Sequence, residues 1–255
     1  MRLENQVAII SGAGSGIGKA TALRFAREGA DIVIVYHRND ENAQKSARMI
    51  EELGRKVLVC KADVGNVPAF REVVDKTFET FNRVDILVNN AGVFIPTPLL
   101  EMTEEVWYET LDTNLKAALF CTQAVARYWV EEGRGGKVIN IGSVHATRSW
   151  PNNTAYASSR AGLRGLTMLM AQELAPYKIN VNMVSPGLIA TRIPREWWEK
   201  PEFRERAQNE IALKRMGEPE EVAGLVFFLA CNDGDYVTGS EYIMDGGLLL
   251  YSYSI

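Results

Sequence analysis

The chain has few of the residue types that build metal centres and disulfide frameworks. Its 255 residues include only 2 histidines and 3 cysteines. The cysteines form no C-x-x-C pair, and with so few histidines a histidine-based metal cluster is not expected. Cysteines that stand alone inside apolar runs indicate buried thiols in a reducing compartment rather than a disulfide framework. The three are Cys60, Cys121 and Cys231.

The chain also lacks the apolar run of roughly 20 residues that a membrane-spanning helix needs. Its first residues lead directly into a short apolar run, so no signal peptide is expected. A net charge of −4 gives no reason to expect a nucleic acid or an anionic membrane as a partner. These absences predict a cytoplasmic protein with neither kind of partner.

What the sequence does contain is a regular alternation of short apolar runs with longer amphipathic stretches. Continuous apolar runs are typical of strands that helices cover on both faces. Strand–helix alternation at this spacing predicts right-handed βαβ units and a parallel sheet. The expected strands are Val7–Ile10, Ile32–Val35, Val57–Cys60, Ile86–Val88, Val138–Ile141 and Ile179–Val184. Because no linker or repeat interrupts the pattern, we predict one doubly wound α/β domain over residues 1–255.

A glycine-rich turn follows the first expected strand and opens the first helix. Glycines at such a turn let the backbone approach a pyrophosphate, which then sits at the positive end of the helix. A glycine-rich turn alone can be purely structural, but its place between a strand and a helix favours a nucleotide site. The residues concerned are Gly12, Ser15, Gly16, Ile17 and Gly18.

Several further motifs stand in a fixed order along the chain, from Val7 to Gly247. They are Ser11-Gly12…Gly16-Ile17-Gly18, Asp63-Val64, Asn89-Asn90-Ala91-Gly92, Asn114, Ser143, Tyr156…Arg160, Pro186-Gly187 with Ile189 and Thr191, and Asp245-Gly246-Gly247. Ser143 lies 13 residues before Tyr156. In these motifs the whole chain resembles the short-chain dehydrogenase/reductase family. Each motif is weak by itself, and the order makes the set specific.

The resemblance implies a Rossmann-type fold, an NAD(P) cofactor and a catalytic group formed by Asn114, Ser143, Tyr156 and Arg160. Tyr156 supplies the proton and Ser143 polarises or positions the substrate oxygen. The residues implied to contact the cofactor are Gly12, Ser15, Gly16, Ile17, Gly18, Tyr36, Arg38, Asp63, Val64, Asn90, Ala91, Gly92, Tyr156, Arg160, Pro186, Gly187, Ile189 and Thr191. No metal site is implied.

One position departs from the family pattern, because Arg160 stands where the family keeps a lysine that lowers the tyrosine pKa. Moving a phenol from pKa ~10 to neutrality takes roughly 3 units, or about 4 kcal/mol. Arginine keeps the positive charge, but its guanidinium is planar, longer and unable to release a proton near neutral pH. We therefore expect cofactor binding to persist and turnover to fall by ~10²-fold. The alternative is a catalytically impaired NADP(H)-binding regulator or scaffold.

The end of the second strand bears on the choice of cofactor. NAD enzymes usually keep a carboxylate here that binds the ribose 2′-hydroxyl and repels a phosphate. Tyr36 occupies that position, and Arg38 nearby could grip a 2′-phosphate. Ser15 is not basic, so a second cation is missing. NADP(H) is favoured and NAD(H) stays possible, while a solvated loop charge is the plainer interpretation of Arg38.

The substrate is less constrained. The stretch from Ser143 to Thr147 and the end Asp245-Gly246-Gly247…Leu250-Tyr251 resemble the bacterial and archaeal glucose 1-dehydrogenase branch, although Ala146 replaces a glutamate common there. The 3-oxoacyl-(acyl carrier protein) reductases share most of these motifs and remain an alternative. His145 either hydrogen-bonds a polyol or is an ordinary loop histidine. The residues expected at the substrate are Ser143, His145, Trp150, Asn153, Tyr156 and Leu188.

Two further expectations concern a lid and an interface. The segment at about 188–212, with adjacent tryptophans at Trp197 and Trp198, sits where the family has a mobile substrate lid. The expected helices at Asn114–Glu131 and Ala155–Pro176 carry more apolar and small residues than one buried stripe requires. This surplus predicts a homo-oligomer, with the family implying a homotetramer.

Overall fold

The computed structural model describes residues 1–191, 205 and 209–250. Seven strands form one parallel sheet in the order β3-β2-β1-β4-β5-β6-β7. The order reverses between β1 and β4, which places a switch in winding direction at the middle of the sheet. The strands are β1 Val7–Ser11, β2 Asp31–Tyr36, β3 Val57–Lys61, β4 Ile86–Asn89, β5 Gly136–Ile141, β6 Ile179–Pro186 and β7 Glu241–Met244.

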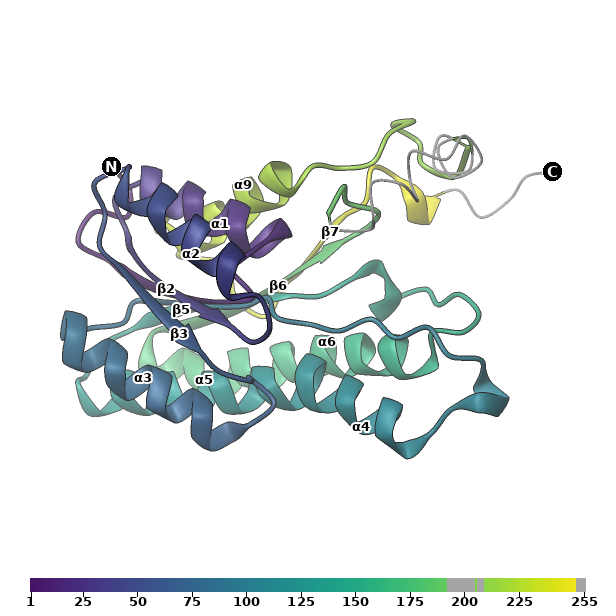
Figure 1. Cartoon of the computed structure of the whole chain (residues 1–255), viewed down its shortest axis with the longest axis horizontal. Coiled ribbons are helices and arrows are strands. Elements are labelled where there is room, and N and C mark those ends of the chain that lie inside the picture. Colours follow the sequence, from purple (N-terminus) through teal and green to yellow (C-terminus); the bar gives the residue numbers. More distant parts are fainter. Residues whose placement is uncertain (192–204, 206–208, 251–255) are drawn as a thin grey trace.

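Helices cover both faces of the sheet, so the predicted doubly wound α/β architecture is confirmed (Figure 1). One layer holds α1 Gly16–Arg27, α2 Asp40–Glu51 and α9 Pro219–Ala230. The other layer holds α3 Val67–Phe81, α4 Glu104–Leu111, α5 Ala117–Glu131 and α6 Thr154–Leu174. Short 3-10 turns lie at Leu99–Glu101 (η1), Val144–Ala146 (η3), Ala175–Tyr177 (η4), Asn232–Gly234 (η5) and Leu248–Leu250 (η6), and η2, Asp112–Lys116, is a π-helical turn.

Alternate residues of each strand point into two separate cores, one under each helical layer. Ile10 and Ile34 belong to the core that also contains Phe25 of α1. Their neighbours Ile9 and Val33 belong to the core on the opposite face. Because successive side chains of a strand alternate between faces, a sheet with helices on both sides needs apolar residues at every position. This is why the strands appear in the sequence as unbroken apolar runs.

Each of the six predicted strands lies within an observed one. The structure adds a seventh strand, β7, which the sequence does not predict because its four residues include Glu241 and none of them is fully buried. One expectation about burial is wrong. The run Val57–Cys60 was expected to be covered on both faces. It forms β3 at the edge of the sheet, paired with β2 alone, and Val57, Leu58 and Val59 are only partly buried.

The remaining sequence predictions have different outcomes. All three cysteines are buried and free, as expected. Within the described residues, no helix has the length and apolar character that crossing a membrane requires. Most of the lid expected at about 188–212, including Trp197 and Trp198, lies outside the described residues.

Candidate active site

A cleft of about 550 Å³ lies at the carboxyl ends of β1, β2, β3 and β4. In open parallel sheets, ligands bind at this edge, where the strand order reverses. The cleft brings together three stretches predicted separately from the sequence, namely the glycine-rich turn, the end of β2 and the segment after β4. Its lining includes Gly12, Gly14, Ser15, Tyr36, Arg38, Asp63, Val64, Ala91, Gly92, Glu109 and Thr113.

The glycine-rich turn is shaped by close contact with Asn90. The Asn90 side chain donates to the carbonyl of Ser11 at 2.8 Å. A Cβ on Gly18 would stand 2.5 Å from the same amide nitrogen, and one on Gly12 would stand 2.8 Å from it. Gly12 also adopts a φ of +69°, which disfavours any larger residue. The two glycines are therefore required by space and backbone angle.

Helix α1 begins at this turn without a side-chain cap. Its N-cap residue, Ser15, makes no capping hydrogen bond, whereas Asn39 caps α2 and Asn66 caps α3 through their side chains. The first amides of a helix need partners, and an anion at the N-terminus supplies them together with a favourable dipole interaction. Backbone left close by the glycines and an uncapped helix end fit the pyrophosphate of a dinucleotide.

The segment after β4 is held in place by buried hydrogen bonds. Ser11 Oγ accepts from the backbone amides of Asn90 and Ala91, both at 2.9 Å. Asn114 lies in the π turn η2, where its amide accepts from Val93 N at 2.8 Å and donates to Val93 O at 2.9 Å. Asn114 also donates to Ser159 Oγ at 3.3 Å. Asn114 thus ties the segment after β4 to α6, and every polar atom of its side chain has a partner.

Tyr156 lies between Ser143 and Arg160 near the first turns of α6. The spacing i, i+4 puts Tyr156 and Arg160 on one helix face, and Ser143 reaches them from the end of β5. Burial by itself would raise the pKa of the Tyr156 phenol. The charge of Arg160 and hydrogen bonds from Arg160 and Ser143 outweigh burial, so the pKa lies below its usual value.

Arg160 is only 6 % exposed. Its Nη1 donates to the carbonyl of Ile141 at 3.2 Å, and its guanidinium carbon lies 4.9 Å from the centre of the Tyr156 ring. A Cβ on Gly92 would meet Nη2 at 2.6 Å, so the guanidinium borders the cleft. Its Nε is buried with no hydrogen-bond partner. An orphaned buried donor of this kind is uncommon in folded proteins, and it fits a site completed by a polar ligand.

His145 follows Ser143 in η3, and both ring nitrogens have partners within the protein. Its Nδ1 lies 3.2 Å from Ser143 Oγ, and its Nε2 lies 3.3 Å from the amide nitrogen of Asn153. Burial, with a smaller contribution from the Arg160 charge, lowers the pKa of His145 to about 4. The imidazole is therefore neutral around pH 7.

An aromatic wall surrounds these groups. The His145 ring lies 4.7 Å from Trp150 and 5.2 Å from Tyr156, measured between ring centres. Phe94 packs edge-on against Tyr156 at 4.9 Å while remaining 54 % exposed. Phe94 is a site residue that was not predicted. Its position two residues after Gly92 could have indicated that it lies near the site. Leu188 packs instead in a small cluster with Val144, Ile211 and Leu248.

Arg38 is not a free loop charge. Its guanidinium pairs with Glu109 of α4 across the cleft, with Nη2 and Oε1 3.4 Å apart. Both side chains are exposed. Glu109 was missed by the sequence analysis, because no local pattern connects residues that lie 71 positions apart.

Three of the other predicted cofactor residues line the cleft beside Arg38, namely Tyr36, Asp63 and Val64.

The remaining ones lie on the loop after β6 and at the start of α1. Pro186 ends β6, and the backbone amide of Gly187 donates to Met244 O at 3.0 Å. Thr191 reaches back to the glycine-rich turn, since a Cβ on Gly16 would lie 3.4 Å from its methyl group. Ile189 is buried and bridges to Gly217, and Ile17 begins α1.

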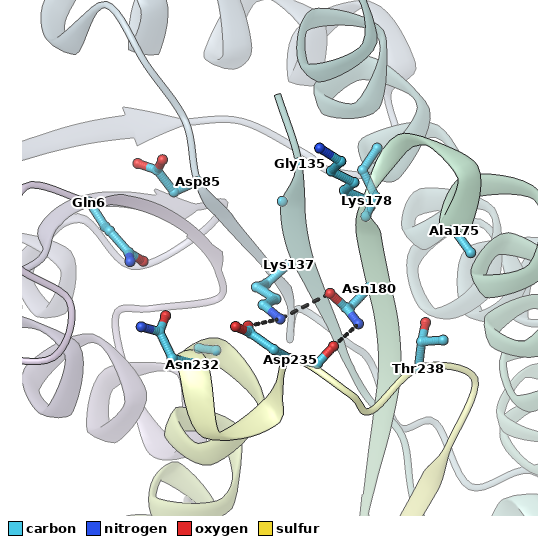
Figure 2. A pocket seen from close by; sticks show the side chains of 13 residues that line it. Gln6, Asp85, Gly135, Lys137, Ala175, Lys178, Asn180, Asn232, Asp235 and Thr238 are labelled. Carbon is cyan, nitrogen blue, oxygen red and sulfur yellow. Dashed lines mark hydrogen bonds and ion pairs between the residues drawn. The ribbon is translucent and has the colours of Figure 1, made fainter. Parts of the chain in front are cut away.

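A second hollow of about 520 Å³ lies at the opposite edge of the sheet (Figure 2). It is lined by polar residues around Lys137 of β5. The Lys137 ammonium donates to Asp235 at 2.8 Å and to Asn180 at 2.9 Å. None of the predicted site residues lies here.

Comparison with known proteins agrees with this geometry. A family model described as enoyl-(acyl carrier protein) reductase matches residues 12–249. The chain is 42 % identical over 250 residues to 3-oxoacyl-[acyl-carrier-protein] reductase FabG of Thermotoga maritima, covering 98 % of this chain and 100 % of that protein. It is 38 % identical over 253 residues to L-rhamnose 1-dehydrogenase (NAD(P)(+)) of Azotobacter vinelandii, covering 98 % and 99 %.

Solved structures are similar over the same length. A short chain dehydrogenase from Burkholderia cenocepacia in complex with NADP superposes with a TM-score of 0.91 at 35 % identity, covering 98 % of this chain and 100 % of that one. Acetoin dehydrogenase from Enterobacter cloacae superposes with a TM-score of 0.89 at 36 % identity, covering 98 % and 99 %.

Proposed function

The chain belongs to the short-chain dehydrogenase/reductase family of NAD(P)-dependent enzymes, and from that premise we propose that it moves hydride between NADP(H) and a hydroxyl or carbonyl carbon of a sugar or small polyol. The family acts on alcohol and ketone groups, and its members include relatives that use either nicotinamide cofactor. The choice of NADP(H) and of a sugar-like substrate is the proposal.

One observation carries the proposal: the Tyr156 phenol lies between the Ser143 hydroxyl and the Arg160 charge, and its pKa is lowered there. A proton donor and acceptor of this kind is effective when its pKa approaches the working pH. A bound nicotinamide supplies or accepts the hydride. The glycine-rich turn and the uncapped start of α1 are the features that would hold this cofactor.

In carbonyl reduction, Ser143 donates a hydrogen bond that orients the substrate oxygen, and Tyr156 gives that oxygen its proton. The positive charge of Arg160 stabilises the phenolate that remains. In alcohol oxidation the same groups act in reverse, with the phenolate as the base. Asn114 holds the strand end and α6 in register through its bonds to Val93 and Ser159.

Relatives of this chain support a small hydroxylated substrate. The sugar enzyme L-rhamnose 1-dehydrogenase and acetoin dehydrogenase both act on compounds with neighbouring oxygen functions. The site offers hydroxyl and amide groups from Ser143 and Asn153 beside the aromatic faces of Phe94 and Trp150. This mixture suits a small ring or chain that carries both C–H and O–H groups.

A 3-oxoacyl-(acyl carrier protein) substrate is the second candidate. The 42 % identity to FabG and the matching family model favour it. Such a substrate would extend a long chain out of the site, so it would be turned over as the thioester and not as a free small ketone.

The pairing of Arg38 with Glu109 sets the strength of the preference for NADP(H). A 2′-phosphate placed beside Tyr36 would have to displace Glu109 from the guanidinium, which weakens the gain from that contact. NAD(H) has no 2′-phosphate and would leave the pair intact, so we expect both cofactors to be used, with a preference for NADP(H).

We further propose that the protein is a homo-oligomer, as a tetramer of the family would be. Helices α5 and α6 expose large apolar side chains that a monomer would leave in water, with Met168 at 55 % and Leu169 at 59 % exposure. Light scattering behind gel filtration tests this. Met168→Glu with Leu169→Glu should yield a smaller species.

The first experiment measures reduction of NADP⁺ and NAD⁺ with a panel of aldoses, polyols, acetoin-like hydroxyketones and secondary alcohols. Oxidation of NADPH with an acetoacetyl thioester is measured in parallel.

Tyr156→Phe is the matched control, because it keeps the ring and loses only the hydroxyl. Turnover with a panel member that vanishes in Tyr156→Phe supports the proposal, whereas turnover of the thioester alone supports the second candidate. Saturable NADPH binding without any turnover would identify an impaired cofactor-binding protein instead.

A further inference from the structure

We propose that His145 is a proton-relay residue that connects Tyr156, through Ser143, to solvent on the side of the molecule away from the cofactor cleft. The inference rests on the proposed function, since a relay is needed only if Tyr156 gives up and regains a proton in each turnover. His145 contacts Tyr156 through Ser143 and is therefore assigned a positioning and transfer role rather than a direct catalytic one.

The hydrogen bonds form a continuous chain with one consistent direction. The Asn153 amide nitrogen can only donate, so at 3.3 Å it faces an unprotonated His145 Nε2. The ring proton then sits on Nδ1 and points to Ser143 Oγ at 3.2 Å. Ser143 Oγ also accepts from the backbone amide of His145 at 3.2 Å. With its acceptor positions occupied, Ser143 directs its own proton to Tyr156 when no substrate oxygen is present to accept it.

A proton route from Tyr156 through Arg160 is excluded for two reasons, the chemistry of the guanidinium and the small volume beside it. A guanidinium does not release a proton at neutral pH, and Nη1 is engaged with Ile141 O. The cavity that Arg160 shares with Asn114 has a volume of only about 10 Å³. That is no more than the least volume a single water needs, so a water wire does not fit there.

The route through His145 opens onto a much larger space. A pocket of about 580 Å³ is lined by His145 and Asn153 but not by Tyr156 or Ser143. Other parts of its lining, including Pro151, Asn152 and Ser158, are exposed at the surface. His145 is thus the only member of the hydrogen-bond chain that contacts both Ser143 and this solvent-open pocket among the described residues.

The transfer balances in protons and charge. After Tyr156 has protonated a substrate oxygen, the Ser143 O–H bond breaks and a Tyr156 O–H bond forms. The His145 Nδ1–H bond breaks and a new Ser143 O–H bond forms, while Nε2 takes a proton from hydronium or a buffer acid in the outer pocket. The ring ends neutral, with its proton moved from Nδ1 to Nε2. Rotation of the Asn153 amide presents its oxygen to this second tautomer. Before the next reduction Nε2 loses its proton to water and Nδ1 gains one from water, which restores the first tautomer; oxidation runs the sequence in reverse.

The surroundings of His145 favour transfer through a neutral ring. The charged and titratable groups that face it are Arg160 and Tyr156 of α6, with Arg148 over the outer ring of Trp150. Burial, with a smaller contribution from the charge of Arg160, disfavours a lasting imidazolium. A neutral imidazole still passes a proton by accepting at one nitrogen while the other releases.

The test compares wild type with His145→Asn and His145→Ala, using NADP⁺ and the substrate found for the wild type. Asparagine keeps an N–H donor toward Ser143 but cannot pass a proton. We expect kcat to fall roughly 10-fold in both variants, with KM for substrate and cofactor unchanged. Added imidazole should restore kcat several-fold in His145→Ala, where the ring has left room, and should not affect the wild type.

A second measurement needs no substrate and therefore separates this inference from the proposed function. After a fast pH jump, the rate at which Tyr156 ionises is followed by tyrosinate absorbance, with Tyr156→Phe subtracted as the blank. His145→Asn should slow this relaxation and leave its end point unchanged. Ser149→Ala, at an exposed residue of the same outer pocket, is the control for general loosening and should relax like the wild type.

Equal relaxation rates in wild type and His145→Asn would overturn the relay, whatever the enzyme turns over. A fall in kcat that imidazole does not reverse, accompanied by a rise in KM, would also overturn it and assign His145 a purely structural role. A slowed relaxation without turnover of any panel member would uphold the relay and count against the proposed substrate class instead.

Discussion

Two hollows of nearly equal size lie at opposite edges of the same sheet, about 550 Å³ at the carboxyl edge and about 520 Å³ at the amino edge. Both contain polar and charged side chains. At the amino edge Lys137 is held by Asp235 and Asn180 (Figure 2). Asp85 of the same hollow pairs with Arg83 at 2.7 Å. The cleft at the carboxyl edge exposes more apolar than polar surface. Volume therefore does not distinguish the two hollows.

What distinguishes them is the polar groups left without partners. At the carboxyl edge the Nε of Arg160 is buried and unpaired, and α1 starts without a side-chain cap. The glycines there keep side chains away from the backbone. Three other buried side-chain atoms of the described residues, Thr21 Oγ1, Arg24 Nε and Thr110 Oγ1, also lack a partner, so an orphaned group alone does not identify a site. Such a group is informative where it coincides with an open helix end and with glycines that leave the backbone accessible, and cavity size does not reveal that coincidence.

The largest effect is expected when the charge at the carboxyl edge is removed. Arg160→Met keeps an unbranched apolar stem and loses the guanidinium, with the charge and the hydrogen bond that lower the pKa of Tyr156. We expect kcat to fall by roughly 10²- to 10³-fold and the pH dependence of oxidation to shift to higher pH, as initial rates across pH would measure.

Arg160→Lys is the matched variant, since it retains the charge on a more compact group. We expect its kcat to exceed that of the wild type, because an ammonium both bridges hydroxyls and exchanges protons. An unchanged or lower rate would mean that the guanidinium, with its bond to Ile141 and its stacking on Tyr156, is the adapted group.

A smaller effect, on the KM for NADP⁺, is expected at the Arg38–Glu109 pair, where a charged group at the carboxyl edge already has a partner. Arg38→Ala should raise KM for NADP⁺ about 10-fold and leave KM for NAD⁺ nearly unchanged. Glu109→Gln should lower KM for NADP⁺, because the guanidinium loses its competing partner. Steady-state kinetics with both cofactors measure this, and equal changes for NADP⁺ and NAD⁺ would show that Arg38 does not contact a 2′-phosphate.

The acid sensitivity of the fold should trace in part to His145. Its folded-state pKa of about 4 lies below the ordinary 6.5, so the unfolded chain takes up a proton that the folded protein resists. The free energy of unfolding should therefore decrease as pH falls from about 6.5 toward about 4. The free energy of unfolding, measured with urea between about pH 6.5 and pH 4, should change less with pH in His145→Asn than in the wild type. His37→Asn, at the exposed second histidine, is the control, and a wild-type profile in His145→Asn would contradict the prediction.

The smallest effect is expected at the amino edge. Lys137→Met removes the ammonium shared by Asp235 and Asn180 and should lower the free energy of unfolding by about 1 kcal/mol. The kcat and both KM values should not change, because the hollow is structural. Urea unfolding and steady-state rates check the two halves of this prediction. A change in rate would show that the two edges are coupled and would weaken the comparison.

The sequence by itself determined the sheet and the main features of the carboxyl edge. Unbroken apolar runs predicted six of the strands, and the turn between the first strand and helix predicted the nucleotide site. These features are local, because strand periodicity and a tight turn follow from backbone geometry over a few residues. Asn114, Ser143 and Tyr156 were implied by the resemblance of the ordered motifs to a known family. The edge position of β3 and the presence of β7 were not predictable in this way, because neighbours in the sheet decide which strand faces are covered.

Only the tertiary structure decided which polar groups end with a partner. Arg38 and Glu109 lie on different elements, and the sequence gives no reason to pair them. The same holds for the unpaired Nε of Arg160 and for the small cavity beside Asn114. Hydrogen-bond satisfaction is a property of packed groups from distant parts of the chain, each within about 3 Å of the next. It depends on strand register and helix placement, which no local pattern records.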